Sequence, residues 1–194
     1  PDAGLPKSEE NIAEVLNKAN YSSAIIGKWH MGTHTSNHPL NRGFEYFYGF
    51  LAGEASQYEP NMVRNTTVVH PNEPKDGKPY HLTEDIADDA IAWLQQHRAF
   101  SPDKPFFMYW APGAVHGPHQ VAKEWADKYK GQFDDGWAAY RERTLERQKK
   151  LGIVPADTEL PARPEAYPAW DSLSDAERTL YARQMEVFAG FSEN

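Results

Sequence analysis

The chain has 194 residues, with 20 Lys and Arg against 28 Asp and Glu, so its formal net charge is −8. This acidic balance excludes a surface built to coat nucleic acid, which needs a basic stripe to neutralise phosphates. No apolar run approaches the ~18 residues that a membrane-spanning helix requires. We therefore expect a soluble chain without nucleic-acid or membrane partners, while its compartment stays open.

The chain contains no cysteine, which excludes disulfides, thiolate zinc sites and cysteine nucleophiles within it. Its first four residues, Pro-Asp-Ala-Gly, include neither an initiator Met nor a basic stretch followed by an apolar one, so we expect no signal peptide here. Any chemistry must rest on His, Lys, Asp, Glu, Ser, Thr or Tyr.

The first predicted elements are a helix and a strand. Ser8 is a candidate N-cap, Asn20 would end the helix, and its apolar face would consist of Ile12, Val15, Leu16 and Ala19. A β-prone run follows over residues 21–30 and ends in Lys28 and His30. A helix followed by a buried strand is typical of an α/β layer, where ligands gather at the carboxyl ends of the strands.

Residues 33–80 are rich in Asn, Pro, Gly and aromatic residues, with one brief strand candidate at residues 66–69. We interpret this stretch as a long, partly ordered excursion of functional importance. His30, His34 and His38 have the spacing of a metal-binding helix face. Because Gly, Thr, Ser, Asn and Pro surround them, a helix is disfavoured there and we expect no zinc site.

A second helix is predicted to begin at Thr83 and to carry His97 and Arg98 near its end, with a buried stripe of Ile86, Ala90, Ile91 and Leu94. After a break at residues 101–105, the apolar strand candidate 106–111 opens into a polar loop that contains His116 and His119. The order helix, strand, polar loop thus occurs twice, and histidine follows both strands.

The remaining sequence predicts helices at residues 123–130 and 137–150, a proline-rich connector at 155–168, and a last helix with the capping-box spacing of Ser174 and Glu177. One side of this last helix would carry Leu180, Tyr181, Gln184, Val187 and Phe188. Two acidic pairs are interpreted as surface charge rather than cation sites: Asp88–Asp89 and Asp134–Asp135.

The strongest local candidate for chemistry is the pair formed by Lys28 and His30. On an extended chain the side chains of residues i and i+2 point the same way, so the two would face one site. An ammonium stabilises an oxyanion and an imidazole exchanges protons near neutral pH. The alternative interpretation is a strand end that carries solvated polar residues.

Three sequence blocks together resemble the sulfatase family, the arylsulfatase-like enzymes of the alkaline phosphatase superfamily. They are Gly-Lys-Trp-His-Met-Gly at residues 27–32, Asn-Arg-Gly-Phe-Glu at 41–45 and Pro-Phe-Phe-Met-Tyr at 105–109. The resemblance implies an α/β fold, here part of an alkaline-phosphatase-like sheet sandwiched by helices and incomplete in this chain. It also implies hydrolysis of a small-molecule sulfate ester.

The resemblance further assigns roles to matching residues. Lys28 would contact the nucleophile and the sulfate oxygens, and His30 would hydrogen-bond the hydrated nucleophile and help release sulfate. His116 would hold the ester near its bridging oxygen. The family's Ala-Pro-His sequence reads Ala114-Val115-His116 here, which leaves Gly113 or His119 as an alternative focus of this loop.

Two parts of the family's machinery have no match in this chain. The formylglycine nucleophile arises from a Cys or Ser motif, and calcium is held by an early acidic pair and a later Asp-Asn pair. We therefore expect an internal segment of one sulfatase catalytic domain, with residues 1–122 as the sheet and active-site part and 123–194 as a mostly helical insert and return helix. Calcium would belong to the parent enzyme, and the segment alone would be inactive.

Two other functions remain open at this point. A phosphodiesterase or phosphonate hydrolase of the same superfamily would share the sheet and the oxyanion-binding residues. A non-catalytic interaction module would explain the absent nucleophile directly, with residues 123–194 as its docking surface.

Overall fold

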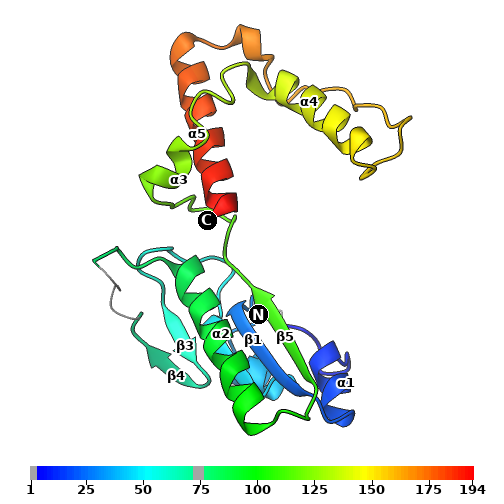
Figure 1. The fold of residues 1–194 in the computed structure, drawn as a ribbon, viewed down its shortest axis with the longest axis vertical. Coiled ribbons are helices and arrows are strands. Elements are labelled where there is room, and N and C mark those ends of the chain that lie inside the picture. Colours follow the sequence, from blue (N-terminus) through cyan, green and yellow to red (C-terminus); the bar gives the residue numbers. More distant parts are fainter. Residues whose placement is uncertain (1–3, 72–76) are drawn as a thin grey trace. The chain divides into compact units, whose positions relative to one another are not determined.

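A five-stranded mixed sheet, in the order β4-β3-β2-β1-β5, organises the first part of the chain (Figure 1). The computed structural model describes residues 4–71 and 77–194; residues 1–3 and 72–76, which belong to the N-terminal stretch and the excursion considered above, lie outside them. Two compact units are present, residues 1–120 and 121–194. No described helix is long and apolar enough to cross a membrane.

Three parallel strands form the centre of the sheet. β1 (Ser22–Lys28) lies between β2 (Tyr46–Phe50) and β5 (Phe106–Ala111) and is parallel to both. β3 (Met62–Arg64) and β4 (Thr67–Val69) extend the sheet antiparallel beyond β2. The strands expected over residues 21–30, 66–69 and 106–111 are thus present. β2 and β3 were not predicted and turn much of the expected excursion into regular structure.

Helix α1 (Ile12–Lys18) begins one turn later than expected. Its N-cap is Asn11 instead of Ser8, because the Asn11 side chain accepts hydrogen bonds from Ala13 N and Glu14 N while Glu14 Oε2 accepts from Asn11 N at 2.8 Å. Asn20 has a φ of 62°, the left-handed conformation expected just after a helix end.

The predicted apolar face of α1 is wrong. Ile12 and Val15 are 58% and 47% exposed, whereas Ala13 is fully buried against a cluster that includes Ile25 and Phe47. The cap at Asn11 sets the rotation of the helix, because the same side chain donates to the Arg42 carbonyl at 2.8 Å. The side of α1 that carries the small residue Ala13 therefore faces the sheet.

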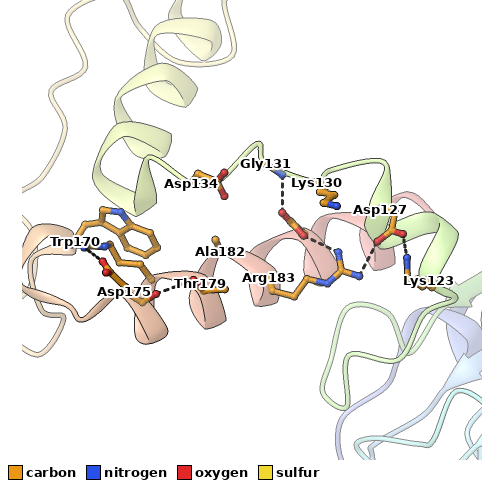
Figure 2. A pocket seen from close by; sticks show the side chains of 12 residues that line it. Lys123, Asp127, Lys130, Gly131, Asp134, Trp170, Asp175, Thr179, Ala182 and Arg183 are labelled. Carbon is orange, nitrogen blue, oxygen red and sulfur yellow. Dashed lines mark hydrogen bonds and ion pairs between the residues drawn. The ribbon is translucent and has the colours of Figure 1, made fainter.

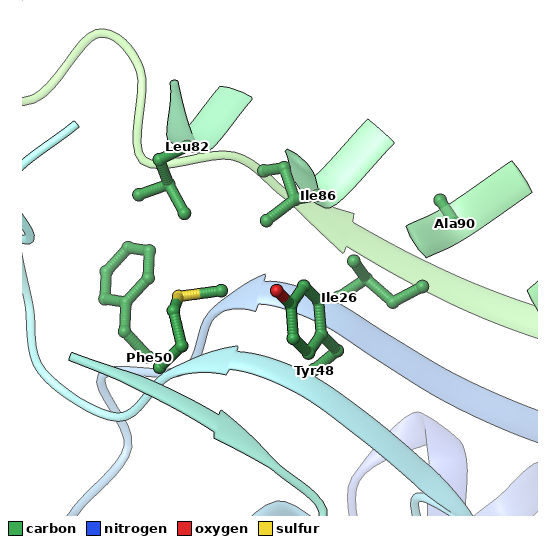
Figure 3. Close-up of a cluster of buried hydrophobic side chains, with 7 residues drawn as sticks. Ile26, Tyr48, Phe50, Leu82, Ile86 and Ala90 are labelled. Carbon is green, nitrogen blue, oxygen red and sulfur yellow. The ribbon is translucent and has the colours of Figure 1, made fainter. Parts of the chain in front are cut away.

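Helix α2 (Leu82–Phe100) covers the other face of the sheet (Figure 3). Leu82, Ile86 and Ala90 pack there on the strand residues Ile26 and Tyr48. Because Ile25 and Ile26 are neighbours on β1, their side chains point to opposite faces. α1 and α2 therefore sandwich the sheet, which confirms the expected α/β arrangement.

Two details of α2 differ from the expectation. Ile91, assigned to the buried stripe, is 53% exposed, and Trp93 packs on the core in its place. Asp89, interpreted as surface charge, has a side chain only 9% exposed and pairs with Arg64 at 2.7 Å, while Tyr46 donates to it at 2.7 Å. Burial raises the pKa of Asp89, and these two hydrogen bonds oppose that rise.

The second unit consists of α3 (Lys123–Asp127), α4 (Gly136–Lys150) and α5 (Asp175–Glu193), with a core of Phe133, Trp170, Leu173 and Ala182. α3 is shorter than predicted, and α4 and the Ser174 capping box of α5 agree with the prediction. Leu180 and Phe188 are 56% and 39% exposed, because α5 turns Ala182, Glu186 and Gly190 inward instead. The 155–168 connector forms neither helix nor strand.

Candidate active site

The carboxyl ends of β2, β1 and β5 lie side by side at one edge of the sheet (Figure 1). Lys28 is the last residue of β1 and pairs in register with Phe50, the last residue of β2. Gly27 pairs with Ala111, the last residue of β5. The segments that carry Lys28, His30 and His116 therefore leave the sheet at the same edge, where parallel α/β sheets place their ligands.

The expectation that Lys28 and His30 lie on the same side of one extended strand is wrong. β1 ends at Lys28, and His30 has a φ of 53°, so the alternation of side chains stops before His30. The backbone there still follows β2, because Trp29 N donates to the Phe50 carbonyl at 3.0 Å and His30 N donates to the Leu51 carbonyl at 3.2 Å.

The imidazole of His30 packs directly against Gly53. A Cβ atom added at Gly53 would lie 2.6 Å from His30 Nε2, closer than side-chain carbons approach one another in proteins. Only glycine allows the chain after β2 to pass this close to the ring. Gly53 thereby fixes one side of the space around His30.

His116 follows β5 and lies next to the same loop. Its Nδ1 is 2.8 Å from the Gly117 carbonyl oxygen and 3.5 Å from Glu54 Oε2. Because a carbonyl oxygen can only accept, Nδ1 carries a proton and donates it. This hydrogen bond leaves Nε2 as the ring nitrogen that can act on a ligand.

Residues 51–54 thus join two histidines that are 86 positions apart in the sequence. Gly53 contacts His30 and Glu54 contacts His116. The loop is braced by Gln120, whose Oε1 accepts from Gln57 N at 2.8 Å and from Ser56 Oγ at 3.3 Å. Gly53 and Glu54 were not predicted from the sequence. The available signal was the aromatic run that ends in Phe50 and is followed, after two further residues, by Gly-Glu.

The alternative residues of the His116 loop have different surroundings. A Cβ added at Gly113, which is buried, would lie 3.3 Å from the Phe50 ring, so this residue packs on the end of β2. His119 is exposed. His116 contacts the chain after β2 through Glu54.

His34 and His38 act as helix caps. The His34 side chain accepts from Ser36 N at the start of the 3-10 helix Thr35–Asn37, and His38 Nδ1 accepts from Leu40 N at the start of Pro39–Asn41. Burial lowers the pKa of His38, against a backbone hydrogen bond that raises it, so its ring stays neutral and able to accept.

The described residues do not fit a calcium site, since residues 4–71 and 77–194 contain no group of three or more His, Asp or Glu side chains arranged to hold a metal ion. Glu54 brings one carboxylate oxygen to 3.5 Å from His116 Nδ1. No step of the chemistry considered below passes through a metal held by this chain.

The second unit contains a cleft of about 810 Å³ (Figure 2). Its charges satisfy one another: the buried Glu186 accepts from Gly131 N at 2.8 Å and from Arg183 at 2.7 Å, and Arg183 also reaches Asp127 at 3.0 Å. Lys123 pairs with Asp127. These contacts hold α3 to α5, and none of the residues predicted for catalysis lines this cleft.

A comparison with known proteins points to one family. The sequence model of the sulfatase family matches residues 1–188. The chain is 31% identical to an uncharacterized sulfatase of Schizosaccharomyces pombe and 30% identical to an arylsulfatase of Klebsiella aerogenes, each over 94% of this chain. It spans 35% and 40% of the length of these relatives.

A solved structure shows the same fold. The crystal structure of Ps i-CgsB in complex with k-i-k-neocarrahexaose matches all of this chain and 37% of its own, with a TM-score of 0.58 and 20% identity. The α/β sheet is therefore part of an alkaline-phosphatase-like fold, as the sequence blocks at 27–32, 41–45 and 105–109 implied. By its sequence and by its fold, the chain belongs to the sulfatase family.

Proposed function

We propose that this chain is a segment of a sulfuric ester hydrolase and that it supplies the residues that hold the sulfate group. The observation that carries the proposal is the meeting of His30 and His116 on one loop, at the edge of the sheet where Lys28 ends β1. Family membership supports the reaction class, and the place of these three residues at one end of the sheet supports their roles.

The reaction breaks the S–O bond of the ester, passes the sulfuryl group to an oxygen nucleophile, and leaves an alkoxide that takes up a proton. Negative charge grows on the departing oxygen as the bond breaks. In this proposal the Lys28 ammonium stabilises charge on the sulfuryl oxygens. His116, protonated at both ring nitrogens, supplies this proton to the bridging oxygen from Nε2, while Nδ1 donates to the Gly117 carbonyl.

His30 occupies the remaining role, which is to hydrogen-bond the nucleophile and exchange a proton with it when sulfate is released. The nucleophile itself, a formylglycine in the family, and the calcium ion would come from parts of the parent enzyme outside this chain. Residues 1–122 would be the sheet and active-site part of that catalytic domain, and residues 123–194 its mostly helical insert and return helix.

The direct test uses the full-length protein that carries this segment. We expect it to hydrolyse 4-nitrophenyl sulfate faster than bis(4-nitrophenyl) phosphate or a phenylphosphonate monoester. Lys28→Ala should lower kcat/KM for the sulfate by about 100-fold or more, because it removes a fixed cation from the transition state. Lys104→Ala, which alters a partly exposed lysine paired with Glu45, should stay within about twofold.

Faster hydrolysis of the phosphate diester or the phosphonate would replace the proposal with the other activities of the superfamily. Loss of activity in Lys104→Ala to the same degree as in Lys28→Ala would remove Lys28 from the site. A full-length protein without any ester hydrolysis, but with a stable partner bound through residues 123–194, would favour the interaction module.

His116 and His119 provide a second matched pair in one loop. His116→Asn should reduce kcat for 4-nitrophenyl sulfate by about 100-fold, and His119→Asn should leave it within about threefold. The loss in His116→Asn should be smaller for substrates whose leaving groups are better, such as 2,4-dinitrophenyl sulfate. A uniform loss with both leaving groups would show that His116 does not act at the bridging oxygen.

A further inference from the structure

A cleft of about 530 Å³ opens beside the two histidines. Its volume lies within the range of small-molecule sites. The loop after β2 lines one wall through Leu51 and Glu54, and Pro118 of the His116 loop lines another. The cleft thus shares its walls with the site proposed above.

The contacts of these walls place the cleft next to the reacting group. Glu54 lines the cleft and lies 3.5 Å from His116 Nδ1. Leu51 also lines it, and its carbonyl accepts from His30 N at 3.2 Å. A sulfate group held between these histidines would therefore direct its organic half toward the cleft.

The polar lining is acidic or neutral. Glu54 and Glu59 contribute carboxylates, Asn61 an amide, and Thr33 and Ser56 hydroxyl groups, and no Lys, Arg or His is among the described residues that line the cleft. The position of Glu59 is linked to Ser56, because Ser56 Oγ accepts from Glu59 N at 3.1 Å and itself donates to Gln120 Oε1 at 3.3 Å.

The rest of the lining is apolar. Phe50 and Val63 contribute side chains at the ends of two neighbouring strands, and Ala52 and Ala55 lie in the loop between them. An apolar wall opposite carboxylates and an amide matches a compact organic group with hydroxyls along one side. It does not match a group with a second negative charge, which the two carboxylates would repel.

We propose that this cleft receives the organic half of the sulfate ester and selects an uncharged, hydroxyl-bearing group over one that carries a second anion. The inference rests on the proposed function and extends it to substrate class. Glu54 and Glu59 are the residues that set this selectivity.

The test measures kcat/KM of the full-length enzyme for three hexose 6-sulfates: glucose 6-sulfate, N-acetylglucosamine 6-sulfate and N-sulfoglucosamine 6-sulfate. The wild type should prefer the first two over the disulfated sugar. Glu59→Gln should lower the ratio of kcat/KM for a monosulfated sugar to that for the disulfated sugar by about threefold to fivefold. The double variant Glu54→Gln with Glu59→Gln should lower this ratio further. Raising NaCl from 50 to 500 mM should lower it in the wild type as well.

Glu45→Gln is the matched control, since Glu45 is an exposed glutamate that pairs with Lys104 and does not line the cleft. Its preference should equal that of the wild type. The salt series needs no variant, so it tests the inference even if a substitution prevents folding.

Other outcomes separate the two proposals. If 4-nitrophenyl sulfate is hydrolysed but the disulfated sugar is preferred, or the preference is insensitive to Glu59→Gln and to salt, the selectivity inference is overturned alone. The same holds if 4-nitrophenyl sulfate is a substrate and all three sugar sulfates are not. If no sulfate ester is hydrolysed, the proposed function fails with it.

Discussion

At the scale of single residues, the site depends on a glycine at position 53, where any side chain would meet the ring of His30. The ring of His30 packs where a Cβ of residue 53 would stand, 2.6 Å from Nε2. His30 already has a left-handed backbone, which is rare for a residue other than glycine. A side chain at residue 53 would have to displace this ring.

Gly53→Ala tests this contact. We expect the His30 ring to be displaced and kcat/KM for 4-nitrophenyl sulfate in the full-length enzyme to fall about tenfold or more, since small misplacements of catalytic groups are costly. In an NMR spectrum the ring signals of His30 should shift, while those of His34, which caps a 3-10 helix, should not. Unshifted His30 signals together with full activity would contradict the described packing.

At the scale of elements, the capping box of α5 was predictable, because it is encoded by two residues three positions apart, Ser174 and Glu177. The box of α1, Asn11 and Glu14, has the same spacing but was missed in favour of Ser8. β2 was missed because its Gly49 and the many Asn, Pro and Gly residues around it read as loop. The face of α1 was mispredicted because its orientation depends on the Asn11 contact with Arg42, 31 positions away.

The site residues likewise divide into those that a local motif indicates and those that depend on distant contacts. Lys28, His30 and His116 could be proposed from local motifs, whereas Glu54 could not. Its partner His116 lies 62 positions away in the sequence, and only the parallel pairing of β2, β1 and β5 brings the two loops together. Contacts set by strand order leave no periodic signal in a single sequence.

The start of α1 makes an element-scale prediction about pH. Burial raises the pKa of Glu14, but hydrogen bonds from Arg42 and from the Asn11 backbone outweigh it, and the net shift is downward. A carboxyl whose pKa is lowered by folding stabilises the folded state above its unfolded pKa, and this stabilisation is lost as pH falls through the folded pKa.

Glu14→Gln should therefore reduce the free energy of unfolding by about 1–2 kcal/mol at pH 7, because a neutral amide replaces the carboxylate that pairs with buried Arg42. The difference from the wild type should shrink below pH 4. Glu10→Gln, which removes an exposed pair with Lys18, should cost less than about 0.5 kcal/mol at any pH. Urea titrations at both pH values measure this, and equal losses in the two variants would exclude the proposed role of Glu14.

At the scale of the whole molecule, apolar surface remains along one side of the sheet. β5 is the last strand in the sheet order and pairs with β1 alone among the described strands. Phe106, Tyr109 and Trp110 of this strand are each nearly half exposed. An edge strand with large exposed side chains is a template for association.

We expect the isolated 194-residue chain to self-associate through this edge and to show no turnover of 4-nitrophenyl sulfate. Trp110→Lys should shift sedimentation velocity profiles toward monomer at a fixed concentration, since a charge on an edge strand opposes pairing. Phe100→Lys changes a more exposed residue at the end of α2 and should leave the association unchanged. A monomeric wild type with a sharp, reversible unfolding transition would refute this expectation.

The loop after β2 has a consequence for how such a site can change over evolution. Its two neighbouring residues Gly53 and Glu54 contact His30 and His116 respectively, and one peptide unit, about 3.8 Å between Cα atoms, separates these two residues. An insertion between these residues would move one histidine contact away from the other. New substrate ranges should therefore arise by exchanging side chains such as Glu59, while the length of this loop stays constant.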